Sequence, residues 1–317
     1  MERITVRPYE DEPPVPSNGT RRRPIRRRAA LAGLLLLCVS PAQTTQTAHA
    51  AEAHDVHHRH TGQRLYVSDY GDNRVVALPT RGGGESVLVL DGLVRPTGLA
   101  WDRAGSLYIA DTGNNRVLRL LPDGGGEATV PTEGLSRPLG LAVDASGDLY
   151  IADSFNDRVV KVAADGSGQS TVPATGLLHP WGLALAPDGD LYVSDFVNDR
   201  VVRVSAAGAQ TTVPVDGLSQ PTGLALSAAG DLYVSDSGNN RVVMIAAGTG
   251  AQTTVPFTGL SNPLGLAVDH RGTLYVADAF NNRVLRLRPN GTQTVLNPTG
   301  LNTPTGLAFP PRTGADR

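Results

Sequence analysis

Short apolar runs recur along the chain, and polar turn residues bound each of them. From about residue 64 to residue 309, runs of four to six residues rich in Val, Ile, Leu and Tyr alternate with clusters of Gly, Asn, Asp and Pro. Runs of this length and composition predict short β-strands joined by tight turns. No stretch carries a helical period long enough to favour a helix. The pattern therefore predicts an all-β domain.

The strands and turns belong to one unit that repeats. GLVRPTGLA at residue 92 returns as GLSRPLGLA, GLLHPWGLA, GLSQPTGLA, GLSNPLGLA and GLNTPTGLA at residues 134, 176, 217, 259 and 300, in steps of 41 or 42 residues. A second segment, such as LYVSDSGNNRVVMI at residues 232–245, follows each of the first five and also precedes the first. Each unit divides into four strands, a to d. A period near 40 with four strands per unit indicates a β-propeller.

Six blades follow from the count of the segments. Five blades are complete, while the chain opens with strands b, c and d (residues 65 to about 91) and closes with a lone strand a (about residues 305–309). These two fragments make one whole blade when the ring closes, which leaves no free sheet edge at the joint. The predicted fold is thus a six-bladed β-propeller of four-stranded antiparallel blades, spanning residues 64–311.

The repeated segments resemble the NHL repeat, written PxGLAvdxxGdLYVaDxxNnRVvrl. The passages TTVPFTGLSNPLGLAVD and TQTVLNPTGLNTPTGLAF are most similar to the extracellular sensor domain of bacterial receptor-type serine/threonine kinases. The resemblance covers residues 64–309 and implies a rigid propeller that binds ligands outside the cell. The Gly-rich loop, HRD and DFG motifs of a kinase domain are absent from the sequence, so the resemblance extends to the sensor module alone.

An acid and an arginine five residues later occur in every b–c turn. Because a catalytic or metal site usually occurs once per domain, a group present in all six blades is interpreted as structural. Asn and Asp tolerate the turn geometry, and the acid can accept turn N–H groups or pair with the arginine. The alternative is a ring of calcium sites, against which the adjacent arginine argues by its charge. The predicted turn residues are Asp69, Arg74, Asp111, Arg116, Asp153, Arg158, Asp195, Arg200, Asp236, Arg241, Asp278 and Arg283.

The positions that vary between blades are the candidates for ligand binding. The b–c turns and the d–a connections are expected on one face, where blades differ beside the proline and within the turn. Four large rings on one rim would form an exposed apolar patch, which often marks a binding surface. The alternative is that the turn phenylalanines pack sideways onto the next blade. The candidates are Trp181, His179, Phe155, Phe196, Phe280, Tyr70, Arg95 and Arg137.

The channel-lining strands offer little for catalysis. Strand a reads GLAW, GLAV, GLAL, GLAL, GLAV and GLAF, without a general acid, general base or metal ligand. His179 and His270 are the only histidines within the repeats, and we expect them on opposite faces. We therefore expect a non-catalytic binding module without metal or cofactor. The alternative is a secreted enzyme of the streptogramin-lyase or lactonase kind.

The first fifty residues are typical of a secretory signal peptide. RRRPIRRR at residues 21–28 precedes the apolar run AALAGLLLLCV, and a polar stretch ends in AHA at residues 48–50. The alternative is a retained N-terminal anchor, although eleven apolar residues are few for a membrane span. Cleavage after Ala50 would remove Cys38, the only cysteine. Residues 51–63 are interpreted as a His-rich linker, which could alternatively bind Cu or Ni loosely, and residues 312–317 as a disordered tail.

Charge narrows the choice of partners. The formal net charge is −2, but residues 1–50 hold eight arginines and four acids, so the remainder carries 20 basic and 26 acidic residues, a net charge of −6. A mildly acidic domain argues against a nucleic acid bound through its phosphates. We expect an extracytoplasmic monomer without a membrane span after cleavage, which binds a protein, peptide or cell-wall ligand.

Overall fold

The computed structural model describes residues 63–81, 83–88, 90–122, 125–296 and 300–312. The predicted signal peptide, all but the last residue of the predicted linker and most of the predicted tail lie outside these residues. In the part of the chain that is described, no helix has the length and apolar character that crossing a membrane requires.

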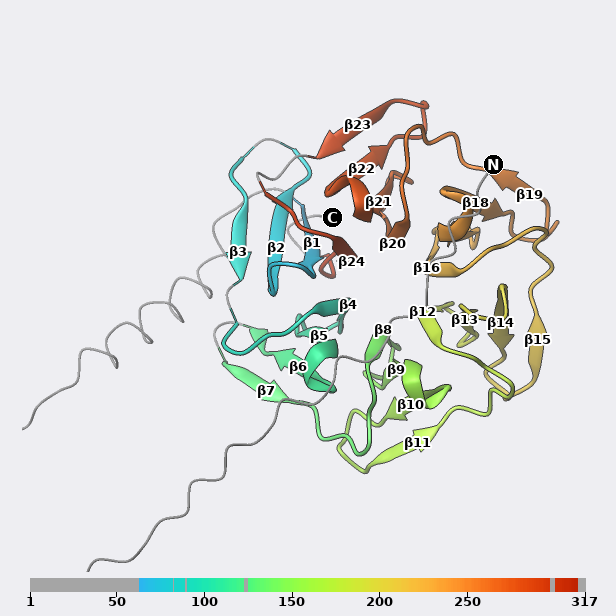
Figure 1. Cartoon of the computed structure of the whole chain (residues 1–317). Coiled ribbons are helices and arrows are strands. Elements are labelled where there is room, and N and C mark those ends of the chain that lie inside the picture. The colour runs from blue at the N-terminus through green and yellow to red at the C-terminus, as the bar shows by residue number, and fades with distance from the viewer. Residues whose placement is uncertain (1–62, 82, 89, 123–124, 297–299, 313–317) are drawn as a thin grey trace, which may run out of the picture. The chain divides into compact units, whose positions relative to one another are not determined.

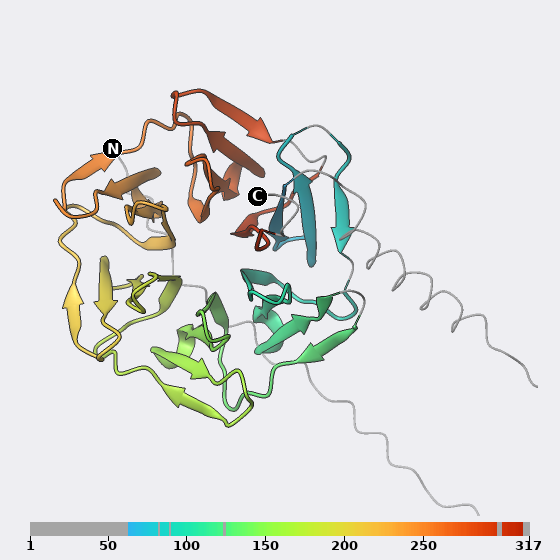
Figure 2. The ribbon, with the colours of Figure 1, turned by 180° about the vertical axis from the view of Figure 1, so that it is seen from behind.

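The structure confirms the predicted six-bladed propeller. Six four-stranded antiparallel sheets surround a centre, with strand a innermost and strand d at the periphery (Figure 1). Blade 1 has the order β24-β1-β2-β3, so its first strand comes from the opposite end of the chain (Figures 1 and 2). Blades 2 to 6 follow in chain order, from β4–β7 to β20–β23. The predicted closure of the ring is therefore also confirmed.

The strands take the following bounds. Strands a are β24 (Pro304–Ala308), β4 (Pro96–Trp101), β8 (Pro138–Val143), β12 (Pro180–Leu185), β16 (Pro221–Leu226) and β20 (Pro263–Val268). Strands b are β1 (Arg64–Asp69), β5 (Leu107–Asp111), β9 (Leu149–Asp153), β13 (Leu191–Asp195), β17 (Leu232–Asp236) and β21 (Leu274–Asp278). Strands c are β2 (Arg74–Pro79), β6 (Arg116–Leu120), β10 (Arg158–Val162), β14 (Arg200–Val204), β18 (Arg241–Ile245) and β22 (Arg283–Leu287). Strands d are β3 (Ser86–Leu88), β7 (Glu127–Thr129), β11 (Gln169–Thr171), β15 (Gln210–Thr212), β19 (Gln252–Thr254) and β23 (Gln293–Leu296).

Short helices occupy the b–c turns of four blades. The 3₁₀ helices are η1 (Thr112–Asn114), η3 (Ser154–Asn156), η4 (Ser237–Asn239) and η5 (Ala279–Asn281). Each begins with a small, buried residue. Blades 1 and 4 carry Tyr70 and Phe196 at that position and form plain turns instead. A large ring does not fit the buried site, so the turn opens and the ring stays half-exposed.

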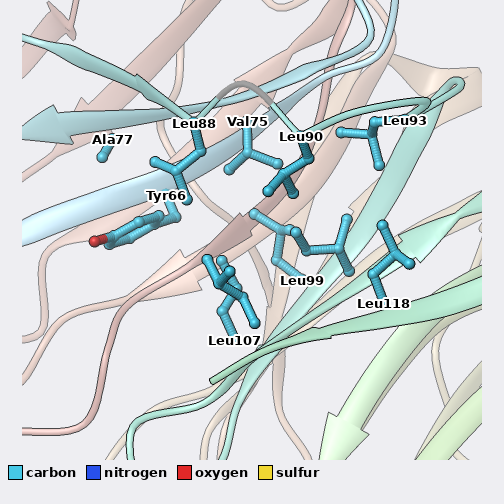
Figure 3. Close-up of a cluster of buried hydrophobic side chains, with 11 residues drawn as sticks. Tyr66, Val75, Ala77, Leu88, Leu90, Leu93, Leu99, Leu107 and Leu118 are labelled. Carbon is cyan, nitrogen blue, oxygen red and sulfur yellow. The ribbon is translucent and has the colours of Figure 1, made fainter. Parts of the chain in front are cut away.

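The hydrophobic core consists of six clusters, one at each seam between neighbouring blades. At the seam of blades 1 and 2, Tyr66, Val75 and Leu88 of blade 1 face Leu99 and Leu107 of blade 2 (Figure 3). Successive residues of β1 point to opposite sheet faces, so Leu65 and Val67 enter the cluster at the seam with blade 6. Both faces of each blade are therefore buried, which explains why the middle strands read as continuous apolar runs.

The blades approach most closely at the glycine of each strand a. A methyl group added at Gly223 would overlap the carbonyl oxygen of Leu264 in the next blade. The same relation holds around the ring for Gly98, Gly140, Gly182, Gly265 and Gly306. Glycine at this position is thus required by close backbone approach rather than by a turn.

Candidate functional site

The b–c turns and the d–a connections lie together, and we call the surface that they form the connector face. The backbone N–H of Gly113 donates to the carbonyl of Val94 at 2.9 Å, and that of Phe155 donates to the carbonyl of Ser136 at 3.1 Å. In blade 4, the N–H of Val197 donates to the carbonyl of Leu178 at 3.3 Å. Each turn therefore lies against the connection that enters its own blade.

The buried acid of each b–c turn joins the turn to this connection. In blade 5, Asp236 accepts the Nε–H of Arg241 at 2.6 Å and the backbone N–H of Ser219 at 2.7 Å. Asn239 donates to Asp236 and to the carbonyl of Gly217, which also accepts from Arg241 at 2.9 Å. All six acids are fully buried and lie 2.6 or 2.7 Å from the arginine five residues on. This network holds two loops in place, which is consistent with the structural interpretation of the cluster.

Blade 1 carries a weaker version of this network. Asp72 occupies the position of Asn239, so the amide donor to the buried acid is replaced by a second carboxylate, which lies 3.3 Å from Arg74 and accepts from the Asn302 side chain at 3.1 Å. Burial raises the pKa of Asp69 above its usual value; the N–H of Asn302 and Arg74 oppose the shift, and the Asp72 carboxylate adds to it. A raised pKa in the folded state means that the contribution of Asp69 to stability is lost as pH rises through that pKa.

Replacing Asp72 by asparagine should therefore stabilise the propeller at neutral pH. We expect a gain of about 1 kcal/mol in the free energy of unfolding, the usual contribution of one hydrogen bond. The gain should shrink toward about pH 3, where carboxyl groups become protonated. Urea denaturation of Asp72→Asn at both pH values measures the effect. The reverse change in blade 4, Asn198→Asp, should destabilise the propeller at neutral pH, and this loss should shrink toward about pH 3. If both variants were as stable as the original protein, this prediction would be wrong.

A second ring of contacts joins neighbouring blades across the connector face. The residue before each connector proline has a φ between 46° and 54°, in the left-handed region, and its N–H points to the turn of the preceding blade. Thus the N–H of Arg95 donates to Asn73 at 2.7 Å, and that of His179 donates to Asp157 at 2.8 Å. The same bond recurs at Arg137, Gln220, Asn262 and Thr303. The backbone at these positions is therefore fixed, while the side chain is free to vary.

Aromatic side chains gather where blades 3 and 4 meet. Phe155 stacks on His179 with ring centroids 4.8 Å apart and 14° between the planes, and the guanidinium of Arg137 lies 4.5 Å from the Phe155 centroid. Trp181 contacts Phe196 within blade 4 at 5.2 Å. Phe155 does pack sideways toward the next blade, yet 47 % of it stays exposed.

Blade 4 carries residues that no other blade has at the variable positions of the connector face. It carries Leu178, Trp181, Phe196 and Val197, where the other blades have mostly Ser, Thr, Gly or Ala. Leu178 and Val197 are 42 % and 49 % exposed. The counterparts of Trp181 are buried between blades: Thr97, Leu139, Thr222, Leu264 and Thr305. Together with Phe155 and His179, these four residues form what we call the blade 4 patch.

The other predicted site residues lie elsewhere on the same face. Tyr70 belongs to the turn of blade 1, where its N–H donates to the carbonyl of Thr303. Arg95 is exposed on the connection between blades 1 and 2, and Phe280 is 67 % exposed in blade 6. The structure therefore groups five of the eight predicted residues, Arg137, Phe155, His179, Trp181 and Phe196. Leu178 was missed, although aligning the repeats shows Val, Ser or Asn at its position.

The central channel is lined by the strands a. Its walls consist of Gly, Leu and Thr residues, together with Trp181 at one point. Within the described residues, no three His, Cys, Asp or Glu side chains come together as a metal-binding group. His179 lies on the connector face, while His270 lies in the a–b turn of blade 6, where it accepts a hydrogen bond from Arg271.

Comparison with solved structures identifies relatives of this fold. A chain of a nidogen/laminin complex aligns with 23 % identity and a TM-score of 0.70, covering 78 % of this chain and 98 % of that one. A streptogramin B lyase aligns with 19 % identity and a TM-score of 0.60, covering 78 % and 89 %. A catalytically inactive histidine-to-alanine variant of virginiamycin B lyase from Staphylococcus aureus, solved with quinupristin, aligns with 16 % identity and a TM-score of 0.60, covering 79 % and 93 %.

Sequence comparison places the chain in a family. No curated protein matches it. The sequence profile of the virginiamycin B lyase family matches residues 84–297, which extend from strand d of blade 1 through blade 6. This match spans more than half of the chain. The protein therefore belongs to the virginiamycin B lyase family.

Proposed function

We propose that this propeller is a non-catalytic binding module that takes up an apolar group of a protein, peptide or cell-wall ligand through the blade 4 patch. The observation that carries the proposal is that four variable positions of blade 4, occupied by Leu178, Trp181, Phe196 and Val197, are apolar and at least partly exposed. Exposed apolar side chains that gather on one surface commonly mark a binding site. Trp181 is the expected anchor, because tryptophan buries a large area at low entropic cost and is enriched at binding hot spots.

The composition of the channel supports binding over catalysis. General acid–base catalysis needs a side chain whose pKa lies near the working pH, usually His, Glu, Asp or Lys. The channel walls are instead built from Gly, Leu and Thr. The buried acids of the b–c turns each engage an arginine and a backbone N–H, and this commits them to the scaffold.

Truncating the two large rings of blade 4 should abolish ligand capture. We expect Trp181→Ala combined with Phe196→Ala to lose at least about tenfold in affinity, since a hot-spot truncation costs about 2 kcal/mol or more. Pull-down from an envelope extract with the immobilised propeller measures the loss. Phe280→Ala is the matched control, because Phe280 is equally aromatic and 67 % exposed but lies in blade 6. Equal capture by the double variant would show that the blade 4 patch is not the site.

A second candidate function is lyase activity toward a streptogramin-like substrate. Family membership favours it, and the related S. aureus enzyme loses activity when a histidine is replaced by alanine. In the described part of this chain, His179 is the one histidine on the connector face. Incubation with quinupristin, followed by mass spectrometry, tests the activity directly. Conversion that disappears in His179→Ala would replace the binding proposal by the catalytic one, and the metal content of the purified protein would show whether an ion takes part.

The proposal includes export from the cytoplasm. It rests on the basic, apolar and AHA segments of residues 21–50, which are typical of a cleaved signal. N-terminal sequencing of the protein recovered from the medium or the envelope tests this part independently of binding. Recovery of the uncleaved chain from the cytoplasm alone would refute it.

A further inference from the structure

The end of the propeller opposite the connector face carries charges of both signs, and these charges are segregated. This surface is formed by the a–b turns and the c–d turns of all six blades. It also includes, in each blade, the one residue of strand c that pairs with the tyrosine of strand b. We call this surface the hairpin face. Counted from the sequence, the formal charges of the hairpin face sum to +3 over blades 6, 1 and 2, and to −4 over blades 3, 4 and 5. The net charge of −6, averaged over the domain, conceals this division.

Blade 6 contributes most of the positive charge. Arg271 and Arg288 are exposed in its turns, and Arg286 lies on β22 opposite Tyr275. Arg286 donates to the carbonyl of Thr80 in blade 1 at 2.7 Å and to Thr294 at 3.0 Å rather than forming an ion pair with Asp269. Within the described residues, no salt bridge involves these three arginines. Their charge is therefore available to a partner.

Blade 1 extends the positive half, and blade 2 completes it without a net charge. Thr80, which accepts from Arg286, is followed directly by the exposed Arg81, so the arginines of blades 6 and 1 adjoin. Blade 1 also carries Arg312 against one acid, Glu85, and keeps a net charge of +1. Blade 2 carries Arg103 and Arg119 against Asp102, which pairs with Arg119 at 3.1 Å, and against Asp123 in the sequence between its strands c and d.

The opposite three blades are acidic at the equivalent positions. In blade 3, Lys161 pairs with Asp148 at 2.7 Å and with Asp144 at 3.8 Å, and this one cation faces three acids, since Asp165 is exposed in the c–d turn. Blade 4 has Asp188 and Asp190 against Arg203, which pairs with Asp190. In blade 5 the cation is replaced by Met244, and Asp231 is held only by Ser227 and the N–H of Ala247. Net charges of −2, −1 and −1 follow for blades 3, 4 and 5.

We infer that two copies of this chain associate through their hairpin faces, with the positive half of each on the negative half of the other. A two-fold axis that lies in the plane of the ring places every blade of one copy on a blade of the other copy. With the axis midway between the two halves, blade 1 lies on blade 4, blade 2 on blade 3, and blade 6 on blade 5. Two of the three kinds of facing pair then join a positive blade to a negative blade, and the third joins the neutral blade 2 to the negative blade 3. The interface is isologous and closed, as in most homodimers.

The charges of such an interface determine its association rate, its orientation and its dependence on salt. Complementary charge speeds association and fixes the orientation, while it adds modest affinity because both partners must be desolvated. The dimer should therefore be sensitive to salt, since charges are screened beyond about 10 Å at 0.1 M and about 3 Å at 1 M. Both connector faces point outward in this arrangement, so the dimer would present two blade 4 patches. From the sequence we expected a monomer; the segregation of charge gives a reason for a dimer.

Charge reversal with rescue tests the dimer. In sedimentation equilibrium, the full chain should dimerise in about 20 mM salt and its dissociation constant should rise at least about tenfold in about 500 mM salt. Arg81→Glu with Arg271→Glu changes the charge of the positive half from +3 to −1, and Asp165→Arg with Asp188→Arg changes the charge of the negative half from −4 to zero, so each variant loses one of the two complementary halves. Each variant alone should be monomeric, whereas an equimolar mixture should form a heterodimer.

The controls separate the interface from folding. All four substituted residues are exposed on turns, so both variants should melt as the original protein does. A chain that remains monomeric at low salt, a dimer that persists in either variant, or a mixture that fails to associate would each overturn the inference.

Discussion

Replacing Gly223 by alanine is expected to lower the free energy of unfolding by about 3 kcal/mol or more, with a matching fall in denaturant midpoint. The added methyl group would overlap the carbonyl oxygen of Leu264 and approach the Leu266 nitrogen of blade 6. Overpacking usually costs about 1 to 3 kcal/mol, because neighbouring side chains can adjust. Here the obstacle is backbone, held by hydrogen bonds on β20, so relief requires that two blades separate.

The ring explains why that separation is costly. Moving blade 5 away from blade 6 opens the seam cluster that includes Leu266, Leu274 and Val276. The closed ring passes the displacement on to the other seams, because each blade packs on both neighbours. Urea denaturation followed by circular dichroism measures the loss.

Gly84→Ala is the matched control, since no atom lies within 4 Å of the methyl group it would add. Gly84 is in the c–d turn of blade 1, where an alanine side chain would project into open space. We expect this variant to unfold within about 0.5 kcal/mol of the original protein, as surface substitutions usually do. A Gly223→Ala protein as stable as Gly84→Ala would show that the strands a are not in contact as described.

The fold could be predicted because each blade repeats the same local pattern. Six copies of LYVSDSGNNRVVMI and its relatives reveal both the strand order and the unequal ends that close the ring. The four short helices were predicted only as turns, because three residues are too few to show a helical period.

The partners of repeated residues could not be predicted in the same way. The sequence suggested that the acid of each b–c turn pairs with the arginine five residues on. Its bond to the connection, as from Asp236 to the N–H of Ser219, spans 17 residues and depends on how the chain crosses between blades. The variable position after the proline was expected on the surface. In five blades it is buried, because the small or aliphatic side chain turns into the seam; Thr97 there donates to the carbonyl of Leu139 at 3.2 Å.

At the candidate site, too, a single residue could be predicted from the sequence, whereas its contacts could not. Trp181 stood out in the sequence because the other blades have Thr or Leu at its position. Its contact with Phe196, and the stack of Phe155 on His179, depend on the seam between blades 3 and 4. The segregation of charge on the hairpin face also could not be recognised in the sequence, because it becomes visible only when the closed ring places blades 6, 1 and 2 next to one another.

Replacing Asp236 by alanine should be about as damaging as Gly223→Ala, at about 3 to 4 kcal/mol. Asp236 is fully buried and accepts hydrogen bonds from Arg241, Asn239 and the backbone N–H of Ser219. Removing one partner of a buried charged pair typically costs about 3 to 5 kcal/mol, because the remaining groups lose their acceptor. We place this site toward the lower end, since the Arg241 side chain is 31 % exposed and water can solvate it.

Two further variants separate charge from shape. Asp236→Asn keeps one oxygen acceptor and should lose about half as much stability as alanine, whereas Asp165→Ala, on an exposed turn, should leave unfolding unchanged. In a double-mutant cycle, Arg241→Ala should add little once Asp236 is absent, because the two side chains act as one unit. Additive losses in that cycle would mean that Asp236 acts mainly through the Ser219 N–H. Binding at the blade 4 patch, in the neighbouring blade, should survive in each variant that still folds, and this would assign the repeated acid to the scaffold rather than to the ligand.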